Sequence, residues 1–332
     1  MPRRRKRRLK TGKIIAALII VVLLIVGIVW IVKALFSPPT PNENSSSSPS
    51  ETLSDSSDAE GSNASDPASA NKSYKTVSMS KDDIHNGDLI LVNYQAAFVS
   101  EEPTDLVTVA SAKTKDYLSK NDTLQVRQTI MKPFNQMMKA FVKETKLKDV
   151  MVLSGHKSLS YQETLYQNDL KKTGKTESEE VAKPGQSEHH TGLAIDLATY
   201  NKTDGSKFLD GNGKYGWINE NCYKYGFVTR FPESKKDITK IIYEPWHYRF
   251  VGTVHAALMQ ENNFCLEEYL EFLKKYPVDG EHLKTIDNGK NYEIYYVPVA
   301  ADAISVDVSV PTEKPYTISG NNMDGLIVTA EV

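Results

Sequence analysis

The pattern of apolar and polar residues divides this chain of 332 residues into three regions. Residues 14–32 carry no charge and are mostly large and apolar. At 1.5 Å per residue in a helix, about 19 such residues just cross a bilayer core of roughly 30 Å. Residues 37–82 are rich in Ser, Asn, Asp and Pro, a composition that buries too little surface to offset chain entropy. We expect a transmembrane anchor at residues 14–36, a disordered stalk at 37–82 and folded structure beyond.

Short apolar runs predict three buried strands in the folded part, at residues 89–92, 149–153 and 194–197. A polar loop rich in Gly and Asn follows the third run and extends to Asn212. Apolar runs of this length, bounded by turn-forming residues, are typical of strands buried in a sheet.

Apolar residues at helical spacing predict three helices. We expect Pro133 at the first position of one helix, where its missing N–H costs nothing. A second helix is predicted at residues 217–225, ended by Gly226, and a third around Leu266 and Leu270. Strands and helices that follow one another without regular alternation indicate an α+β fold, with mixed helices around a small antiparallel sheet at residues 83–276.

Beyond Pro277 the pattern changes to β-rich segments, such as residues 292–297 and 304–308, separated by Gly, Asn and Pro turns. These predict a small C-terminal unit at residues 277–332. A unit of about 50 residues is near the size at which independent folding becomes difficult.

The basic residues of the N-terminus predict how the chain crosses the membrane. Residues 2–13 contain eight Lys or Arg and no acid, so by the positive-inside rule residues 1–13 form a cytoplasmic tail. A cleavable signal peptide is the alternative, but its apolar region is usually about 7–15 residues long and ends at an A-x-A-like site, which this chain lacks. We expect a single-pass anchor in the cytoplasmic membrane, with everything after Phe36 on the outer, cell-wall side.

The overall charge of −2 hides an acidic exterior. Without the eight basic residues of the tail and Lys33, 31 basic residues remain against 42 acidic ones, a net charge near −11. Nucleic-acid partners require a basic face, so this balance argues against them. Cys222 and Cys265 are the only cysteines, and we favour two buried thiols over one disulfide bond.

Two segments carry the residues of a hydrolytic zinc site. Residues 187–196 contain His189 and Asp196, and residues 244–247 have the sequence Glu-Pro-Trp-His. A catalytic zinc ion takes three protein ligands from His and Asp or Glu and leaves one position open for water. We expect His189, Asp196 and His247 to be the ligands of one zinc ion.

Glu244 is placed to be the base that takes a proton from the attacking water. In an extended segment residues i and i+3 point to opposite faces, so Glu244 and His247 converge only if Pro245 and Trp246 form a bend. Pro245 favours such a bend.

On these residues, the chain resembles the VanY-type zinc D-alanyl-D-alanine carboxypeptidases of bacterial cell walls, relatives of the D-Ala-D-Ala dipeptidases and, more distantly, of hedgehog domains. The family pattern S-x-H-x-x-G-x-A-x-D is complete at residues 187–196, and the pattern E-P-W-H-[YF]-R is complete at residues 244–249. The resemblance extends from about Leu89 to about Leu270. It implies the same zinc ligands and the same base.

One family pattern, S-G-Y-R-S-x-x-x-Q, is altered at residues 154–162. Lys157 replaces the arginine that the resemblance implies contacts substrate and stabilises developing charge. Lysine keeps the positive charge but lacks the planar fork of donors. Gln162 and Ser187 stay in register, and the resemblance implies that Ser187 helps to hold the substrate.

Several neighbouring residues have both a structural and a functional interpretation. Trp246 and Tyr248 either pack around His247 or line the substrate pocket, and we include both among the candidate substrate-binding residues. His190 is expected to face away from His189 and to bind no metal. Arg230 and Arg249 are interpreted as structural partners of acids.

The sequence predicts an extracytoplasmic zinc metallopeptidase that removes the C-terminal D-alanine from peptidoglycan stem peptides, a D,D-carboxypeptidase. An L,D-carboxypeptidase acting on tetrapeptide stems, a cross-bridge endopeptidase and a non-catalytic zinc-containing wall-binding module are the alternatives. Structural zinc sites are usually closed by a fourth protein ligand, and no such ligand is evident here, which favours catalysis.

Overall fold

The computed structural model describes residues 73–178 and 180–332. The predicted cytoplasmic tail, the predicted anchor at residues 14–36 and most of the predicted stalk lie outside these residues. Among the helices in the described ranges, none is both long and apolar enough to span a bilayer.

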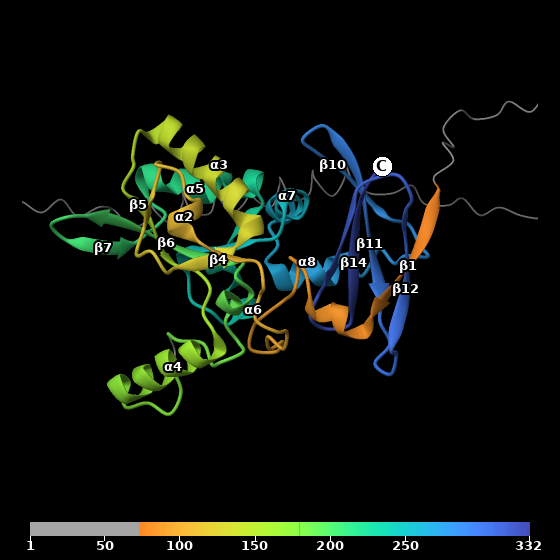
Figure 1. Cartoon of the computed structure of the whole chain (residues 1–332), viewed down its shortest axis with the longest axis horizontal. Helices are drawn as coiled ribbons and strands as arrows, with labels where there is room; N and C mark the ends of the chain where they lie inside the picture. The colour runs from red at the N-terminus through yellow and green to blue at the C-terminus, as the bar shows by residue number, and fades with distance from the viewer. Residues whose placement is uncertain (1–72, 179) are drawn as a thin grey trace, which may run out of the picture. The chain divides into compact units, whose positions relative to one another are not determined.

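A largely antiparallel sheet with strands between residues 118 and 250 forms the centre of the part of the chain that precedes the C-terminal unit (Figure 1). Its strands are β3 (Leu118–Ser119), β5 (Val150–Ser154), β6 (Ala194–Asn201), β7 (Gly205–Phe208), β8 (Phe227–Phe231) and β9 (Glu244–Phe250). Their order is β3-β5-β6-β9-β8, β7 pairs with the outer part of β6, and only β3 and β5 run parallel. The strands predicted at residues 149–153 and 194–197 and the α+β class are confirmed.

The longest described helix, α3 (Gln128–Thr145), packs its apolar face on this sheet. Phe134 of α3 meets Phe227 of β8 edge-on, with ring centroids 5.9 Å apart. Pro133 lies inside the helix, so its predicted place at the first helical position is wrong. Ile130, before the proline, is fully buried in the core. Burying that earlier turn outweighs the roughly 3 kcal/mol that an interior proline costs.

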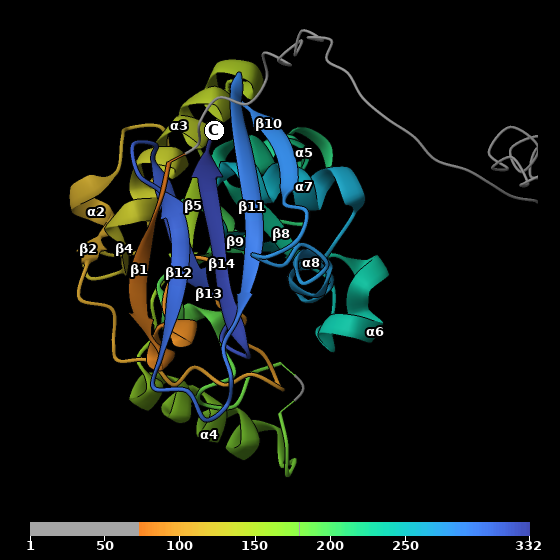
Figure 2. The ribbon, with the colours of Figure 1, turned by 90° about the vertical axis from the view of Figure 1, so that its right-hand side faces the viewer.

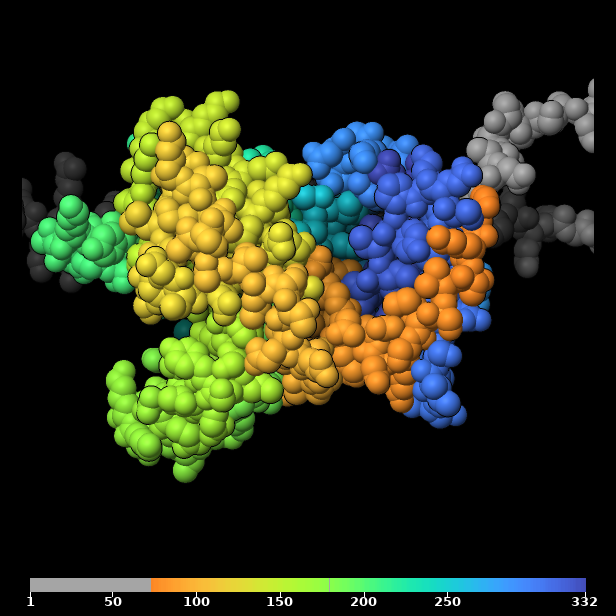
Figure 3. Space-filling model, in the orientation of Figure 1, coloured from red at the N-terminus to blue at the C-terminus, as the bar shows by residue number. Residues whose placement is uncertain are grey.

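Shorter elements surround the sheet. They are β2 (Leu106–Thr108), β4 (Gln125–Arg127), α2 (Val109–Ala112), α4 (Leu159–Thr173), α5 (Gly216–Asn221), α6 (Lys236–Thr239), α7 (Thr253–Asn262), α8 (Leu266–Leu273) and the 3-10 turns η1 (Lys81–His85), η2 (Glu188–Thr191), η3 (Gly213–Tyr215), η4 (Cys222–Tyr225) and η5 (Glu233–Lys235). The helix predicted at residues 217–225 is formed by α5 and η4 and ends at Gly226, with φ 82°. The space-filling view shows α4 standing out from the body across a recess (Figure 3).

The segment at residues 89–92 is buried but is not a strand, contrary to the prediction. Its backbone groups bond to other parts of the chain. The Leu89 N–H donates to Ser319 Oγ at 2.9 Å, the Leu91 N–H donates to the Asn321 carbonyl, and the Ile90 carbonyl accepts from Arg249. An apolar run shows that a segment is buried, but it does not specify which partners bond to the backbone.

The C-terminal unit is a small β structure of two sheets (Figure 2). Its strands are β1 (Tyr74–Ser80), β10 (Leu283–Asp287), β11 (Lys290–Pro298), β12 (Ser305–Pro311), β13 (Tyr316–Gly320) and β14 (Gly325–Glu331). Strand β1 pairs with β12 along its whole length, so the predicted stalk at residues 37–82 extends too far. One apolar core contains residues of α7, α8, β11 and β14. The C-terminal unit therefore shares a core with the preceding helices and does not depend on a core of its own alone.

Candidate active site

The register of the sheet brings two predicted metal ligands together. Asp196 of β6 lies directly opposite His247 of β9 in an antiparallel pair. Side chains at such positions share one face, with Cβ atoms roughly 5 Å apart. His247 Nδ1 is 2.8 Å from Asp196 Oδ1.

His189 reaches the same place from the 3-10 turn η2, immediately before β6. Gly192 ends the turn with φ +68°, a conformation that glycine adopts without strain. A Cβ there would lie 2.9 Å from Arg127 Cγ, so space as well as backbone conformation requires glycine. His189 Nε2 lies 3.1 Å from Asp196 Oδ2.

His189, Asp196 and His247 offer one ligand atom each, and these atoms lie within 4.8 Å of one another. All three side chains are buried, with exposures of 4–7%. Two imidazoles and one carboxylate are a donor set that zinc accepts in catalytic sites. No fourth His, Cys, Asp or Glu joins this group among the described residues.

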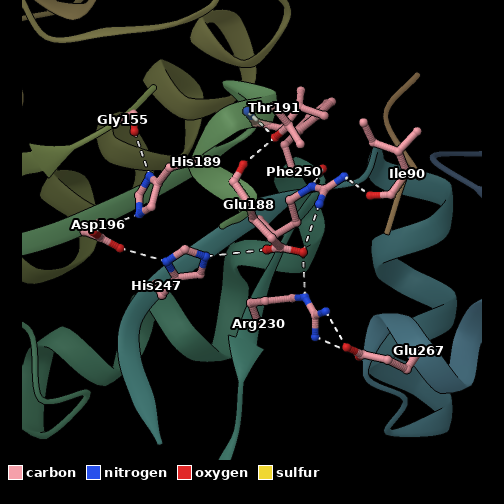
Figure 4. Close-up of polar contacts among 12 residues, drawn as sticks. Ile90, Gly155, Glu188, His189, Thr191, Asp196, Arg230, His247, Phe250 and Glu267 are labelled. Atoms are coloured by element: carbon pink, nitrogen blue, oxygen red, sulfur yellow. Dashed lines mark hydrogen bonds and ion pairs between the residues drawn. The ribbon is translucent and has the colours of Figure 1, made fainter. Parts of the chain in front are cut away.

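In both histidines, the ring nitrogen that does not face Asp196 faces another oxygen atom. His189 Nδ1 is 2.7 Å from the Gly155 carbonyl, and His247 Nε2 is 3.5 Å from Glu188 Oε2 (Figure 4). A metal-binding histidine usually donates its other N–H to such an acceptor. The arrangement leaves His189 Nε2 and His247 Nδ1 to face a metal ion.

The electrostatics of the three ligands favour a bound cation. Burial alone lowers the pKa of His247, but Asp196 and Glu188 outweigh burial and raise it to about 9. Burial opposes ionisation of Asp196, yet the neighbouring His189 and His247 hold its pKa well below the usual range. Burial and the Lys157 ammonium lower the pKa of His189 to about 4, so this imidazole is neutral and free to bind metal at neutral pH.

Glu244 faces the ligands because β9 is irregular at this point. Thr229 pairs with Tyr248 and Phe231 pairs with Glu244, so two steps along β8 correspond to four along β9. The predicted bend at Pro245 and Trp246 is therefore present as a bulge. Burial raises the pKa of the Glu244 carboxyl, and His247, Asp196 and Lys157 all act on its charge.

Lys157 is a cation that interacts electrostatically with His189 and Glu244. It follows β5 and Gly155, and its backbone N–H donates to the His189 carbonyl at 3.2 Å. Burial lowers the pKa of its ammonium, while the charges of Asp196 and Glu244 act in the opposite direction. The side chain thus places a positive charge beside the base and a ligand.

Comparison with known proteins identifies the family to which this chain belongs. The model of the VanY family, D-alanyl-D-alanine carboxypeptidase, matches residues 123–253. A D-alanyl-D-alanine carboxypeptidase of Enterococcus faecium is 32% identical over 321 residues, which are 96% of this chain and 95% of the relative. The chain belongs to the VanY family of D-alanyl-D-alanine carboxypeptidases.

Two further relatives agree with membership of the VanY family. The bifunctional D-Ala-D-Ala dipeptidase and carboxypeptidase VanXYC of Enterococcus gallinarum is 36% identical over 131 residues, 38% of this chain and 68% of that protein. The crystal structure of the D,D-dipeptidase VanXYg with a D-Ala-D-Ala phosphinate analogue has a TM-score of 0.70 and 32% identity, covering 78% of this chain and all of that one. The VanY-family chain is accordingly a metallopeptidase, and its His2Asp ligand set fits zinc.

Glu188 is a site residue that sequence reasoning missed. Its buried carboxylate accepts from Arg230 Nε at 2.8 Å and from Arg249 Nη1 at 2.9 Å (Figure 4). Burial opposes its charge, but the two guanidinium groups outweigh burial and hold its pKa far below the usual range. The signal was present in the sequence: two arginines in apolar strands require a buried acid. The structural interpretation of both arginines is confirmed.

The candidate substrate-binding residues of this VanY-family chain have different positions. Trp246 is partly exposed and stacks on Phe208, with ring centroids 4.8 Å apart, so it is available to a ligand. Tyr248 is fully buried in the core and its hydroxyl donates to Asn219, a position that agrees with the packing alternative given for this residue. The strand alternation that points His247 toward the metal ligands turns Tyr248 to the opposite face.

Gln162 and Ser187 are both buried. Gln162 Nε2 donates to the Ala182 carbonyl at 2.8 Å, which ties α4 to the segment after it, while its Oε1 has no hydrogen-bond partner in the described chain. The substrate contact of Gln162 stays a prediction. The Ser187 carbonyl accepts from the His190 N–H at the start of η2.

The predictions for His190 and for the two cysteines agree with the structure. His190 Nδ1 contacts the Lys157 carbonyl, and its Nε2 accepts from the Gly185 N–H, so both ring nitrogens are engaged away from the ligand group. Cys222 and Cys265 are buried free thiols, as predicted. Burial raises the pKa of the Cys222 thiol to about 12, so it is not a thiolate at neutral pH.

Proposed function

We propose that this chain is a D,D-carboxypeptidase that removes the C-terminal D-alanine from peptidoglycan stem peptides outside the cytoplasmic membrane. The observation that carries the proposal is the position of Glu244, a partly buried carboxyl that interacts electrostatically with the ligands His247 and Asp196 in a chain of the VanY family. A purely structural zinc site has no use for an additional, uncoordinated carboxylate.

In the proposed reaction, a zinc ion held by His189, Asp196 and His247 would supply an activated water molecule and polarise the scissile carbonyl. Glu244 takes a proton from the attacking water and delivers it to the leaving amine of D-alanine. The burial that raises its pKa also strengthens it as a base. Lys157 offsets the negative charge that develops on the carbonyl oxygen.

The location of the reaction is part of the proposal. The apolar residues 14–36, behind the basic residues 1–13, tether the enzyme to the cytoplasmic membrane with its catalytic part on the wall side. Protease added to intact, wall-stripped cells is expected to remove the part beyond residue 36 and leave a membrane-bound N-terminal fragment. A full-length chain that resists protease until the cells are lysed contradicts this topology.

The reaction is tested with purified full-length chain in detergent and two synthetic stems, a pentapeptide ending in D-Ala-D-Ala and a tetrapeptide ending in one D-Ala. Mass spectrometry is expected to show loss of one alanine from the pentapeptide and little change in the tetrapeptide. Faster cleavage of the tetrapeptide would make the chain an L,D-carboxypeptidase and overturn the D,D assignment.

Glu244→Gln tests the proposed base. Turnover is expected to fall by about 10²- to 10⁴-fold, with zinc still bound, because the glutamine has no basic site. Glu233→Gln removes an exposed glutamate of η5 and is the matched control, expected to retain wild-type turnover. Equal turnover in the two variants would remove Glu244 from its proposed role.

A further inference from the structure

We propose that Glu188 is a positioning residue that holds His247 in the orientation and tautomer needed to bind metal through Nδ1. The inference deepens the proposed function, because it takes His247 to be a zinc ligand of the reaction. It assigns a task to a carboxylate that neither the ligand set nor the base accounts for.

The first observation is a matched pair of buried atoms. Glu188 Oε2 and His247 Nε2 have no closer hydrogen-bond partner in the described chain, and they face each other at 3.5 Å. On the other side of the same ring, Nδ1 lies 2.8 Å from Asp196 Oδ1. Figure 4 shows the imidazole lying between the two carboxylates. The ring therefore has one nitrogen toward the ligand group and one toward Glu188.

The second observation is that Glu188 is held firmly. Its Oε1 accepts from Arg230 and Arg249, which leaves Oε2 for His247. Arg230 is itself fixed by two hydrogen bonds to Glu267, at 2.9 and 2.7 Å. Arg249 Nη2 donates to the Ile90 carbonyl at 2.9 Å and to a second carbonyl of the same segment. Two arginines and two glutamates balance in charge, as a buried cluster requires.

A consequence for the imidazole follows from hydrogen-bond chemistry. Paired with two guanidinium groups, the Glu188 carboxylate only accepts hydrogen bonds. The nitrogen facing it must therefore keep its proton when a metal ion displaces the proton on the other nitrogen, so in the metal-binding form Nε2 is N–H and the lone pair is on Nδ1. His189 follows the same rule with the opposite nitrogen, because the Gly155 carbonyl faces its Nδ1.

Glu188→Gln is the informative change because it replaces the hydrogen-bond acceptor that faces His247 Nε2 with a donor. The two arginines need an acceptor, so they orient the amide oxygen toward themselves and turn the NH2 group toward His247 Nε2. That nitrogen must then accept, and the proton moves to Nδ1, where it blocks the metal. We expect the dissociation constant of zinc, measured with a competing chelating dye, to rise by about 10- to 100-fold.

Glu267→Gln is the matched control. It weakens the same buried cluster through Arg230, but among the described residues the ion-pair partners of His247 are Glu188 and Asp196 and not Glu267. We expect its zinc affinity to stay within about threefold of wild type, even if its thermal stability falls as far as that of Glu188→Gln. Equal losses of zinc affinity in the two variants, or none in Glu188→Gln, would overturn the proposal and leave Glu188 a structural residue.

If Glu188→Gln does not fold, nitrogen NMR of histidine-labelled, zinc-loaded wild-type chain decides. The proposal requires a proton on His247 Nε2 and zinc at Nδ1, and the reverse assignment contradicts it. Both measurements are independent of turnover. Inactivity on every stem peptide with these results intact would reject the proposed function and leave the positioning role standing.

Discussion

Acid is predicted to destabilise the fold through His255, a buried histidine of α7 that is not part of the ligand group. Its ring is 7% exposed and joins three elements, with Nδ1 2.8 Å from the Tyr269 hydroxyl of α8 and Nε2 2.9 Å from the Thr329 hydroxyl of β14. Burial lowers the pKa of His255 to about 4, against 6.5 for an ordinary histidine. The folded state therefore binds fewer protons than the unfolded state between these values.

The sign and size of the effect follow from this difference in pKa. Stability is complete above about pH 6.5 and falls as the pH drops toward 4, because only the unfolded chain takes up the proton. At about 1.4 kcal/mol per unit of pKa, the loss is roughly 3 kcal/mol by pH 4. Glutamine at 255 can bond to both hydroxyls but cannot titrate in this range.

The assay is urea unfolding of wild type and His255→Gln at several pH values from 8 to 4. Zinc ligands and other acids titrate equally in both proteins, so the difference between the two curves isolates His255. We expect the free energy of unfolding of the variant to fall by about 3 kcal/mol less than that of wild type. Parallel curves would refute the reasoning that His255 is held neutral by burial.

Three further predictions concern the site and the core. Gly192→Ala places a Cβ on a backbone with φ +68°, 2.9 Å from Arg127 Cγ. We expect the free energy of unfolding, measured in urea, to fall by about 1–3 kcal/mol and zinc binding to weaken. Wild-type zinc affinity would contradict the link between this turn and His189. Phe227→Ala empties a fully buried position between Phe134 and Phe250 and is expected to cost about 3–5 kcal/mol, whereas a loss under about 1 kcal/mol would mean that this core is loosely packed. Free zinc at 100 times its dissociation constant is expected to add about 2.7 kcal/mol over the chelated chain, and a melting temperature independent of zinc would show that the folded state does not bind it.

The ligands and the base were predictable from the sequence for a physical reason. His189 and Asp196 are close along the chain, and Asp196 and His247 end up as direct partners on adjacent strands. In short motifs of this kind, the relative positions of the side chains are set mainly by nearby residues. Few contacts between distant parts of the chain therefore need to be known to predict the site. Even the bend at Pro245 follows from the need for Glu244 and His247 to converge.

The errors arose where tertiary partners decide the structure. Residues 89–92 are apolar enough for a strand, but their backbone bonds are taken by side chains and loops more than 150 residues away. Strand β1 has exposed side chains along one edge and no buried run, so its pairing with β12 leaves little trace in its own sequence. The two arginines indicate that some buried acid is needed, but Glu188 is identified as that acid only when the folded chain brings Arg230 and Arg249 to it.

The central claim is that two imidazoles and one carboxylate hold a single zinc ion with a position left for water. Zinc X-ray absorption spectroscopy of the full-length, zinc-loaded chain tests it directly. We expect a first shell of nitrogen and oxygen only, with scattering from two imidazole rings, and loss of one of these rings in His247→Ala. A sulfur atom in the shell, or a third imidazole, would contradict the account.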